Sequence, residues 1–253
     1  MAVLVRDFLA VKSRADVDGT MAYFSRDALP VHAELAQRLQ VLPTRILGDS
    51  TSALVFYTDT PGMFGPSEIR AAVVLDFRQG KIAREVDYWD GRHFGVSETA
   101  KLRLPEADFP KDFRESTVGE GAASTMTDVS HRLAGALWDG DGTLAAELFA
   151  PDAVFEDIPA HVQIVGPRSI GSFITDAASL LPYAGAGTAV RHVVGSAMGG
   201  GYEWTSSDGP VPHGVIALEL NRWQKISRLT AMWDGSLVEE STLVSLARTA
   251  IER

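Results

Sequence analysis

Residues 81–91 read KIAREVDYWDG, and residues 225–235 read KISRLTAMWDG. Lys, Ile, Arg, Trp, Asp and Gly recur in register, and the two tryptophans, Trp89 and Trp233, are 233 − 89 = 144 positions apart. Six identities in eleven positions indicate an internal duplication, the signature of a repeated structural unit. The sequence therefore predicts two copies of one fold.

The similarity extends to the segments that precede these stretches. AAVVLDFR at 71–78 aligns with VIALELNR at 215–222, and ILGDSTSALVFYT at 46–58 aligns with VVGSAMGGGYEWT at 193–205. Val, Ile, Phe, Tyr and Trp concentrate in these runs, and Gly or Pro separates them, which is typical of β-strands. We expect each copy to place its helices first and three long strands afterwards, an α+β order with the helices on one face of a curved, mainly antiparallel sheet.

The two copies differ in length near their beginnings. DGTMA at 18–22 resembles DGTLA at 141–145, but the offset there is only 141 − 18 = 123. The first copy therefore lacks about twenty residues, which in the second copy correspond to AVFEDIPAHVQIVGP at 153–167. In its place the first copy has PVHAELAQRLQVLP at 30–43, which the leucine spacing predicts to be one amphipathic helix. We infer that the first copy has lost a β-hairpin.

These boundaries divide the chain into three parts. Residues 1–96 form the shortened domain, and residues 97–124, with two prolines and mixed charge, form a linker. Residues 125–253 form the complete domain, which ends in an amphipathic helix over 237–252.

Composition excludes several classes of function. The formal net charge of −10 argues against a nucleic-acid or anionic-membrane surface, since both need clustered Lys and Arg. Cysteine is absent, and the six histidines are scattered without a metal-binding spacing, so we expect no metal and no cofactor. Neither a secretory leader nor an apolar run of membrane-spanning length is visible, which predicts a cytoplasmic protein.

A family resemblance rests on LFAPDAVFEDIP at 148–159 and GPRSIGSF at 166–173. A helix end that leads into an Asp-bearing strand, and then a Gly that opens the next helix, resembles the nuclear transport factor 2-like superfamily. Its members include SnoaL-like polyketide cyclases and ketosteroid isomerases. The resemblance covers most of residues 126–236 and, less completely, residues 4–95. It implies two tandem cone-shaped α+β domains.

The resemblance nominates three residues for chemistry. Asp157, in the step Glu156-Asp157-Ile158, takes the place of the proton-shuttling base. Glu219 takes the place of an acid that stays protonated in order to donate to an oxyanion. His131 lies near the place of a family tyrosine that this sequence lacks. A carboxylate in an apolar cone has a raised pKa, which suits a catalytic base. The non-catalytic alternatives are that Asp157 caps a turn and that Glu219 and His131 are solvated.

Four aromatic residues could form the apolar walls of a cavity in the second domain. Trp233 matches an aromatic residue that lines the pocket in the family, and the others follow by the same reasoning; the set is Phe149, Phe173, Trp204 and Trp233. The alternative for each is an ordinary position in the core.

The first copy keeps one acid of interest, Asp87 in VDYWDG. Limonene-type epoxide hydrolases of the same superfamily have a similar ending, in which an Asp works with a second Asp and an Arg. Asp59 and Arg70 could supply such partners. Because the hairpin that would carry a base is missing, we expect the first domain to have a structural or pairing role.

These observations give a leading hypothesis and two alternatives. The leading hypothesis is a cofactor-independent acid/base enzyme, of the isomerase, cyclase or dehydratase type, that acts on a hydrophobic polyketide-like or other carbonyl compound. The alternatives are an epoxide hydrolase or epoxide-opening cyclase, and a non-catalytic module that binds small molecules or proteins. Since superfamily members commonly pair through their sheets, we expect an internal pseudo-dimer, with a homodimer as a further option.

Overall fold

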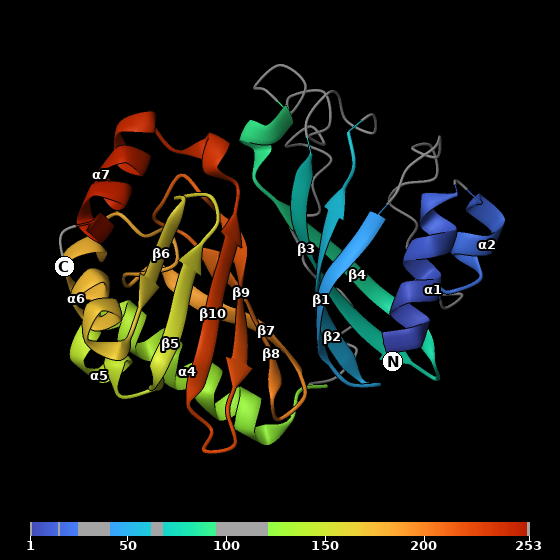
Figure 1. Cartoon of the computed structure of the whole chain (residues 1–253), viewed down its shortest axis with the longest axis horizontal. Coiled ribbons are helices and arrows are strands. Elements are labelled where there is room, and N and C mark those ends of the chain that lie inside the picture. The colour runs from blue at the N-terminus through green and yellow to red at the C-terminus, as the bar shows by residue number, and fades with distance from the viewer. Residues whose placement is uncertain (1, 15, 25–40, 62–67, 95–120, 252–253) are drawn as a thin grey trace.

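The chain forms two β-sheets with helices on their outer sides (Figure 1). The computed structural model describes residues 2–14, 16–24, 41–61, 68–94 and 121–251. Within these residues the first sheet has four strands in the order β1-β2-β3-β4, and the second has six in the order β6-β5-β10-β9-β8-β7. The prediction of an α+β fold with two sheet-and-helix units, the first of them shorter, is confirmed.

In its described residues the first unit has two α-helices and one antiparallel meander. Its elements are α1 (Ala2–Ser13), α2 (Val17–Met21), β1 (Val41–Gly48), β2 (Ser52–Asp59), β3 (Ile69–Arg78), β4 (Lys81–Trp89) and the short 3-10 helix η1 (Gly91–Phe94). Helix α1 buries Val5, Phe8 and Leu9 against one face of the sheet. That spacing puts the three side chains on a single face of the helix.

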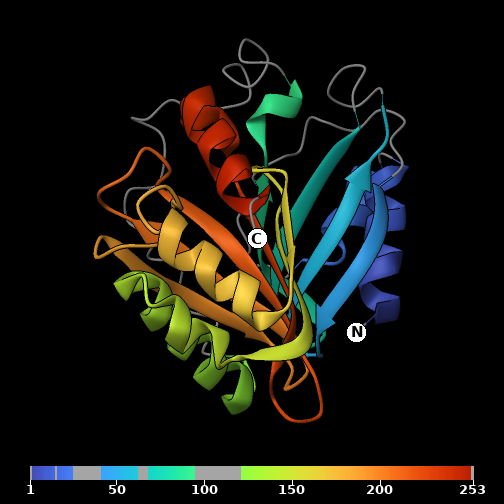
Figure 2. The ribbon, with the colours of Figure 1, turned by 60° about the vertical axis from the view of Figure 1, so that its left-hand side comes forward.

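The second unit follows the same plan, with more elements described than in the first. Its elements are α4 (Ser124–Asp139), α5 (Gly142–Ala146), β5 (Phe149–Asp157), β6 (Val162–Val165), α6 (Pro167–Ala177), β7 (Thr188–Gly195), β8 (Gly199–Ser206), β9 (His213–Leu220), β10 (Ile226–Trp233), η2 (Gly235–Leu237) and α7 (Glu240–Ile251). Strand β5 runs parallel to β10, and all other pairs are antiparallel. Figure 2 shows α4, α6 and α7 covering one face of this sheet.

Matching helix caps define how the two copies align. The side chain of Asp16 accepts a hydrogen bond from the backbone N–H of Gly19 at the start of α2, and Asp141 accepts one from Leu144 at the start of α5. Such a cap satisfies one of the free N–H groups of a helix N-terminus. The structural offset is therefore 141 − 16 = 125. The sequence similarity between DGTMA and DGTLA has an offset of 123, so it is displaced by two residues from the structural alignment.

The alignment continues into the first residue of the predicted missing hairpin. Phe24 forms a parallel bridge with Ile82, as Phe149 does with Ile226 in the second unit. The residues that follow Phe24, 25–40, lie outside the described part of the chain, and so does most of the helix predicted over 30–43. Its last three residues belong to β1, which corrects that end of the prediction.

Each meander has four strands rather than the predicted three. A turn after Gly48 separates β1 from β2, and a turn after Gly195 separates β7 from β8, within stretches that the sequence pattern treats as continuous. Both glycines have positive φ angles, 144° and 110°, and a Cβ at either position would collide with the facing backbone. The two glycines thus make the tight reversals possible.

The two sheets pack against each other through the faces that the helices leave uncovered. The buried cluster between them takes residues from both units: Leu47, Leu54, Phe56, Ala72, Val74 and Tyr88 from the first, and Val194, Val215, Ala217 and Met232 from the second. The hydroxyl of Ser52 also accepts a 2.8 Å hydrogen bond from the backbone N–H of Gly195. Alternation along each strand therefore gives every sheet one helix-facing side and one sheet-facing side.

A buried polar network lies within this apolar contact. Glu203 on β8 is fully buried, and its carboxylate lies 2.7 Å from the guanidinium of Arg84 on β4. Tyr88 donates a hydrogen bond to the same carboxylate, and Arg191 lies 3.4 Å from it. Charged groups that leave water need oppositely charged partners of this kind to be tolerated. The network consequently ties one position of β8 to one position of β4.

No helix in the described ranges is long and apolar enough to cross a membrane.

Candidate functional site

Asp157 is the last residue of β5, and its side chain lies on the helix-facing side of the second sheet. It is opposite Ala231 in the parallel pairing, and Phe155 two residues earlier belongs to the same buried core. The side chain is fully buried. The structure therefore places Asp157 in the interior of the second unit.

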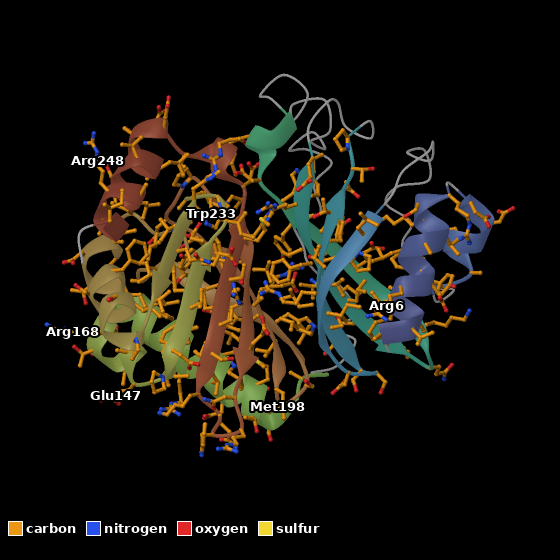
Figure 3. The ribbon with its side chains drawn as sticks, in the orientation of Figure 1. Arg6, Glu147, Arg168, Met198, Trp233 and Arg248 are labelled. Carbon is orange, nitrogen blue, oxygen red and sulfur yellow. The ribbon has the colours of Figure 1, made fainter. Side chains whose placement is uncertain are left out.

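Three donors hold the Asp157 carboxylate. Its Oδ1 accepts a 2.9 Å hydrogen bond from the backbone N–H of Ala160, and its Oδ2 accepts a 2.7 Å bond from the hydroxyl of Tyr183. The indole Nε1 of Trp233 lies 3.1 Å from both oxygens. Figure 3 shows Trp233 at the upper end of the second sheet, where β10 ends. The three donors fix the orientation of the carboxylate and compensate in part for its burial.

Burial nevertheless dominates the electrostatics of this group. It raises the pKa of Asp157 to about 6, although the hydrogen bonds from Ala160, Tyr183 and Trp233 act in the opposite direction. Burial and the neighbouring carboxylate of Asp157 likewise raise the pKa of Tyr183 well above its usual value. A carboxyl group with a pKa near neutrality can both accept and return a proton, which is the property that general acid/base catalysis requires.

A pocket of about 320 Å³ lies on the same side of the sheet, between α4 and strands β7 and β8. Its lining is mainly apolar and aromatic, and includes His131, Trp138, Tyr183, Val190, Tyr202 and Trp204. Asp157 itself does not line the pocket. Tyr183 does, so this one side chain touches both the pocket and the buried carboxylate.

One residue that lines the pocket, Trp204, has an unused hydrogen-bond donor. Trp204 is 1% exposed, and its Nε1 has no hydrogen-bond partner in the described part of the chain. Its ring lies against Gly214, where a Cβ would collide with it, and 5.9 Å from the ring of Tyr183. A buried donor without an acceptor is costly, so it suggests that the acceptor belongs to a ligand.

The predicted pocket residues fall into two groups. Trp204 lines the pocket, and His131 lies at its exposed edge on α4. Trp233 contacts Asp157 instead, while Phe149 and Phe173 are buried in the core and do not line the pocket. These two phenylalanines occupy positions in the buried core of the second unit.

Glu219 does not share a cavity with Asp157, which corrects the prediction that it is an oxyanion partner. Its neighbours Leu218 and Leu220 point into the helix-facing core, so the alternation of β9 turns Glu219 toward the first unit. There its Oε1 accepts a 2.9 Å hydrogen bond from Arg45 on β1. The acid in the apolar strand serves the contact between the sheets.

Sequence reasoning missed Tyr183. It lies between α6 and β7, in the stretch LLPYAGAG, where no periodic pattern marks it. Two weak signals existed: the absence of the tyrosine that the family supplies from its first helix, and an aromatic residue in an otherwise Gly- and Ala-rich loop. Only the fold brings this loop to the end of β5.

In the first unit, Asp87 and Asp59 belong to one cluster on the helix-facing side of the sheet, together with Lys12, Tyr57 and Glu85. The third proposed partner, Arg70, is not part of it. Arg70 is largely exposed, on β3, and lies 3.6 Å from Glu68. Within the described ranges, no group of three or more His, Cys, Asp or Glu residues is arranged to hold a metal ion.

Comparison with known proteins gives structural similarity only. No protein-family model matches the sequence, and no curated protein matches it. A steroid delta-isomerase from Pseudomonas aeruginosa is similar in structure, with 15% identity and a TM-score of 0.39 over 51% of this chain and 90% of its own.

Two further solved structures are proteins of unknown function. An NTF-2 like protein from Burkholderia xenovorans has 19% identity and a TM-score of 0.37, over 44% of this chain and 83% of its own. A SnoaL-like protein from Burkholderia thailandensis has 9% identity and a TM-score of 0.37, over 43% and 93%. Each of these structures matches about half of the chain.

Proposed function

We propose that the second domain is a cofactor-independent acid/base enzyme that abstracts a proton next to the carbonyl group of a hydrophobic small molecule. The observation that carries the proposal is the Tyr183–Asp157 hydrogen bond, which connects an apolar pocket to a buried carboxylate whose pKa is about 6. Isomerisation, aldol-type cyclisation and dehydration all begin with this step.

Tyr183 is the residue in contact with the substrate, and Asp157 is the final proton acceptor. The oxygen of Tyr183 takes the proton from the carbon, while the proton of its own hydroxyl passes to Oδ2 of Asp157 over 2.7 Å. The electron pair of the broken C–H bond forms the enolate. Return of the proton by the reverse path to a different carbon completes an isomerisation, and attack of the enolate on a second carbonyl closes a ring.

The enolate oxygen needs a donor, and Trp204 supplies one. Its Nε1 is buried and unpaired, and its side chain lines a pocket that is otherwise mainly apolar, where a hydrogen bond to developing charge is stronger than in water. Trp204 takes the role that the sequence assigns to Glu219. The apolar lining favours an uncharged, ring-containing substrate, such as a polyketide-like compound.

Hydrogen exchange at carbon tests the proposal without knowledge of the natural substrate. We expect the protein to catalyse exchange of the acidic protons of β-tetralone, a bicyclic ketone, in deuterium oxide as followed by NMR. Asp157→Asn should reduce the enzyme-catalysed rate by about 100-fold or more, since general-base catalysis contributes factors of this order. Asp152→Asn, an exposed acid on the same strand, is the matched control and should not change the rate.

Two results would refute the proposal. One is exchange that persists unchanged in a folded Asp157→Asn variant. The other is saturable binding of β-tetralone by the unmodified protein without any catalysed exchange, which would favour the alternative of a non-catalytic binding module.

A further inference from the structure

Equivalent positions in the two units differ in polarity on the helix-facing side of the sheet. The strand pairings equate Glu85 with Leu229 and Asp87 with Ala231, both at the offset of 144 that relates Ile82 to Ile226. The helix caps likewise equate Lys12 with Leu137, at the offset of 125. All three positions are fully buried and apolar in the second unit, whereas all three carry charge in the first.

These charged side chains converge with two more polar residues beneath α1. The ammonium of Lys12 lies 2.9 Å from Oε1 of Glu85 and 4.0 Å from Oδ2 of Asp87. The hydroxyl of Tyr57 donates a 3.2 Å hydrogen bond to Oδ1 of Asp87. The side chains of Lys12, Glu85 and Asp87 are 29%, 14% and 19% exposed, and charges that are partly removed from water need partners that offset the lost hydration.

Asp59 completes the cluster and leaves one acceptor free. It follows Tyr57 by two residues on β2, so both side chains share the same side of the sheet. It is 4% exposed, and its Oδ1 is buried without a hydrogen-bond partner in the described residues. Burial raises the pKa of Asp59 to about 6; the charge of Lys12 lowers it, and that of Asp87 raises it.

The charge of the cluster is unbalanced. One ammonium faces three carboxylates, those of Asp59, Glu85 and Asp87, so the fully ionised cluster carries two excess negative charges. Aromatic and aliphatic side chains of the first core, including Phe8, Val55 and Val73, surround it on the same side of the sheet. A ligand that carries a positively charged N–H donor on an apolar group would balance this charge and pair with the free acceptor of Asp59.

We infer that the helix-facing side of the first sheet is a second ligand site, which binds a primary organic ammonium through Oδ1 of Asp59, with Asp87 and Glu85 balancing its charge. The site is independent of the chemistry proposed for Asp157. The two copies thus have sites of different selectivity. The site in the second domain takes an uncharged ligand with a hydrogen-bond acceptor, and the site in the first takes an organic cation.

Calorimetric titration of the full-length protein with benzylamine, a cation at pH 7, tests the inference against benzyl alcohol, its uncharged analogue of similar shape. We expect saturable binding of benzylamine and at least about tenfold weaker binding of benzyl alcohol, as a lost charge-assisted hydrogen bond implies. Asp59→Asn should weaken benzylamine binding by a similar factor. Asp152→Asn, on an exposed position of the second unit, removes the same charge and should leave the affinity unchanged.

Circular dichroism shows whether the Asp59→Asn variant is folded, and Asp87→Asn repeats the test if it is not. The inference is overturned if benzylamine does not bind saturably, if benzyl alcohol binds equally well, or if folded variants at positions 59 and 87 retain full affinity. Binding of Mg²⁺ that depends on Asp59, with no binding of benzylamine, would also overturn it in favour of a metal site. Loss of β-tetralone exchange does not bear on it, because that reaction belongs to the other domain.

Discussion

The hydroxyl of Tyr183 donates a 2.7 Å hydrogen bond to Oδ2 of Asp157, and the same tyrosine lines the pocket of the second domain. This relationship joins two features that are separate in the sequence by 183 − 157 = 26 positions. The carboxylate is fully buried, which raises its pKa, while the side chain of Tyr183 lines the pocket. The predictions for the second domain follow from this arrangement.

Tyr183→Phe should reduce the catalysed exchange of β-tetralone by about 100-fold, because the proton can no longer pass through the phenol. It also removes a hydrogen bond that lowers the pKa of Asp157, so any residual activity should show its acid limb at a higher pH than the unmodified protein, whose limb is expected near 6. Rates measured between about pH 4 and 8 check both effects, since the window spans the usual and raised carboxyl pKa values. Exchange that is unaffected by the substitution would exclude the relay.

Trp204→Phe should abolish the preference of the pocket for an acceptor-bearing ligand. The unmodified protein is expected to bind β-tetralone about 2- to 10-fold more tightly than tetralin, its hydrocarbon analogue, which is the range for one net hydrogen bond. Phenylalanine keeps an aromatic ring but lacks the N–H group, so the two ligands should then bind alike. Quenching of tryptophan fluorescence measures both affinities, and an unchanged ratio would show that the indole nitrogen has no role in recognition.

Asp157 should make folding stability depend on pH. Its pKa rises from 3.8 in the unfolded chain to about 6 in the folded one, so between these values the folded state holds a proton that the unfolded state has lost. The resulting stabilisation is complete below the lower value and disappears as the pH rises through the upper one. Asp157→Asn should therefore lower the free energy of unfolding at pH 4, relative to that at pH 7, by roughly 1–3 kcal/mol compared with the unmodified protein. Urea denaturation at the two pH values measures this change. An equal difference in both proteins would contradict the raised pKa.

Glu203→Gln should destabilise the contact between the two sheets. Glu203 is fully buried and pairs with Arg84, so the substitution leaves a buried guanidinium less well compensated and should cost about 3 kcal/mol. Glu219→Gln is the matched control, because its partner Arg45 is linked to it at 2.9 Å in a half-exposed pair; it should cost less than about 1 kcal/mol. Chemical denaturation compares the two variants. Equal losses would mean that burial does not distinguish the two pairs.

Much of the fold could be predicted because duplication leaves two records of the same pattern. The stretches ending in Trp89 and Trp233 indicate the repeat, and β-rich runs next to Gly turns indicate the meanders. The length difference between the copies also points to the segment around Asp157 as their main divergence. The local alignment of the two copies was wrong at one place, because DGTMA is displaced by two residues from its structural equivalent. A helix cap is defined by the side chain that accepts from a free backbone N–H, and similar sequences need not mark that position.

The candidate site was only partly predictable. The resemblance indicates Asp157, and the sequence predicts Trp204 as a wall of the cavity, but neither the hydrogen bond to Tyr183 nor the free indole donor can be deduced from spacing. Glu219 was assigned to the wrong side of its strand. A period of two fixes which residues share a side, yet it does not say which side faces helices and which faces another sheet.

The sequence by itself determined the duplication, the placement of the first helices before the meander in each copy, and the residue types available at each position. Only the tertiary structure decided what those residues do. The contact between the sheets committed Glu203 and Glu219 to pairing, and the loop after α6 brought Tyr183 to Asp157. The tertiary structure also brought Lys12 of α1 together with Asp59 and Asp87 of the first sheet, in the domain for which the sequence predicts a structural or pairing role. The physical reason is that charge, burial and hydrogen bonding depend on distances between residues remote in the chain, which local patterns do not specify.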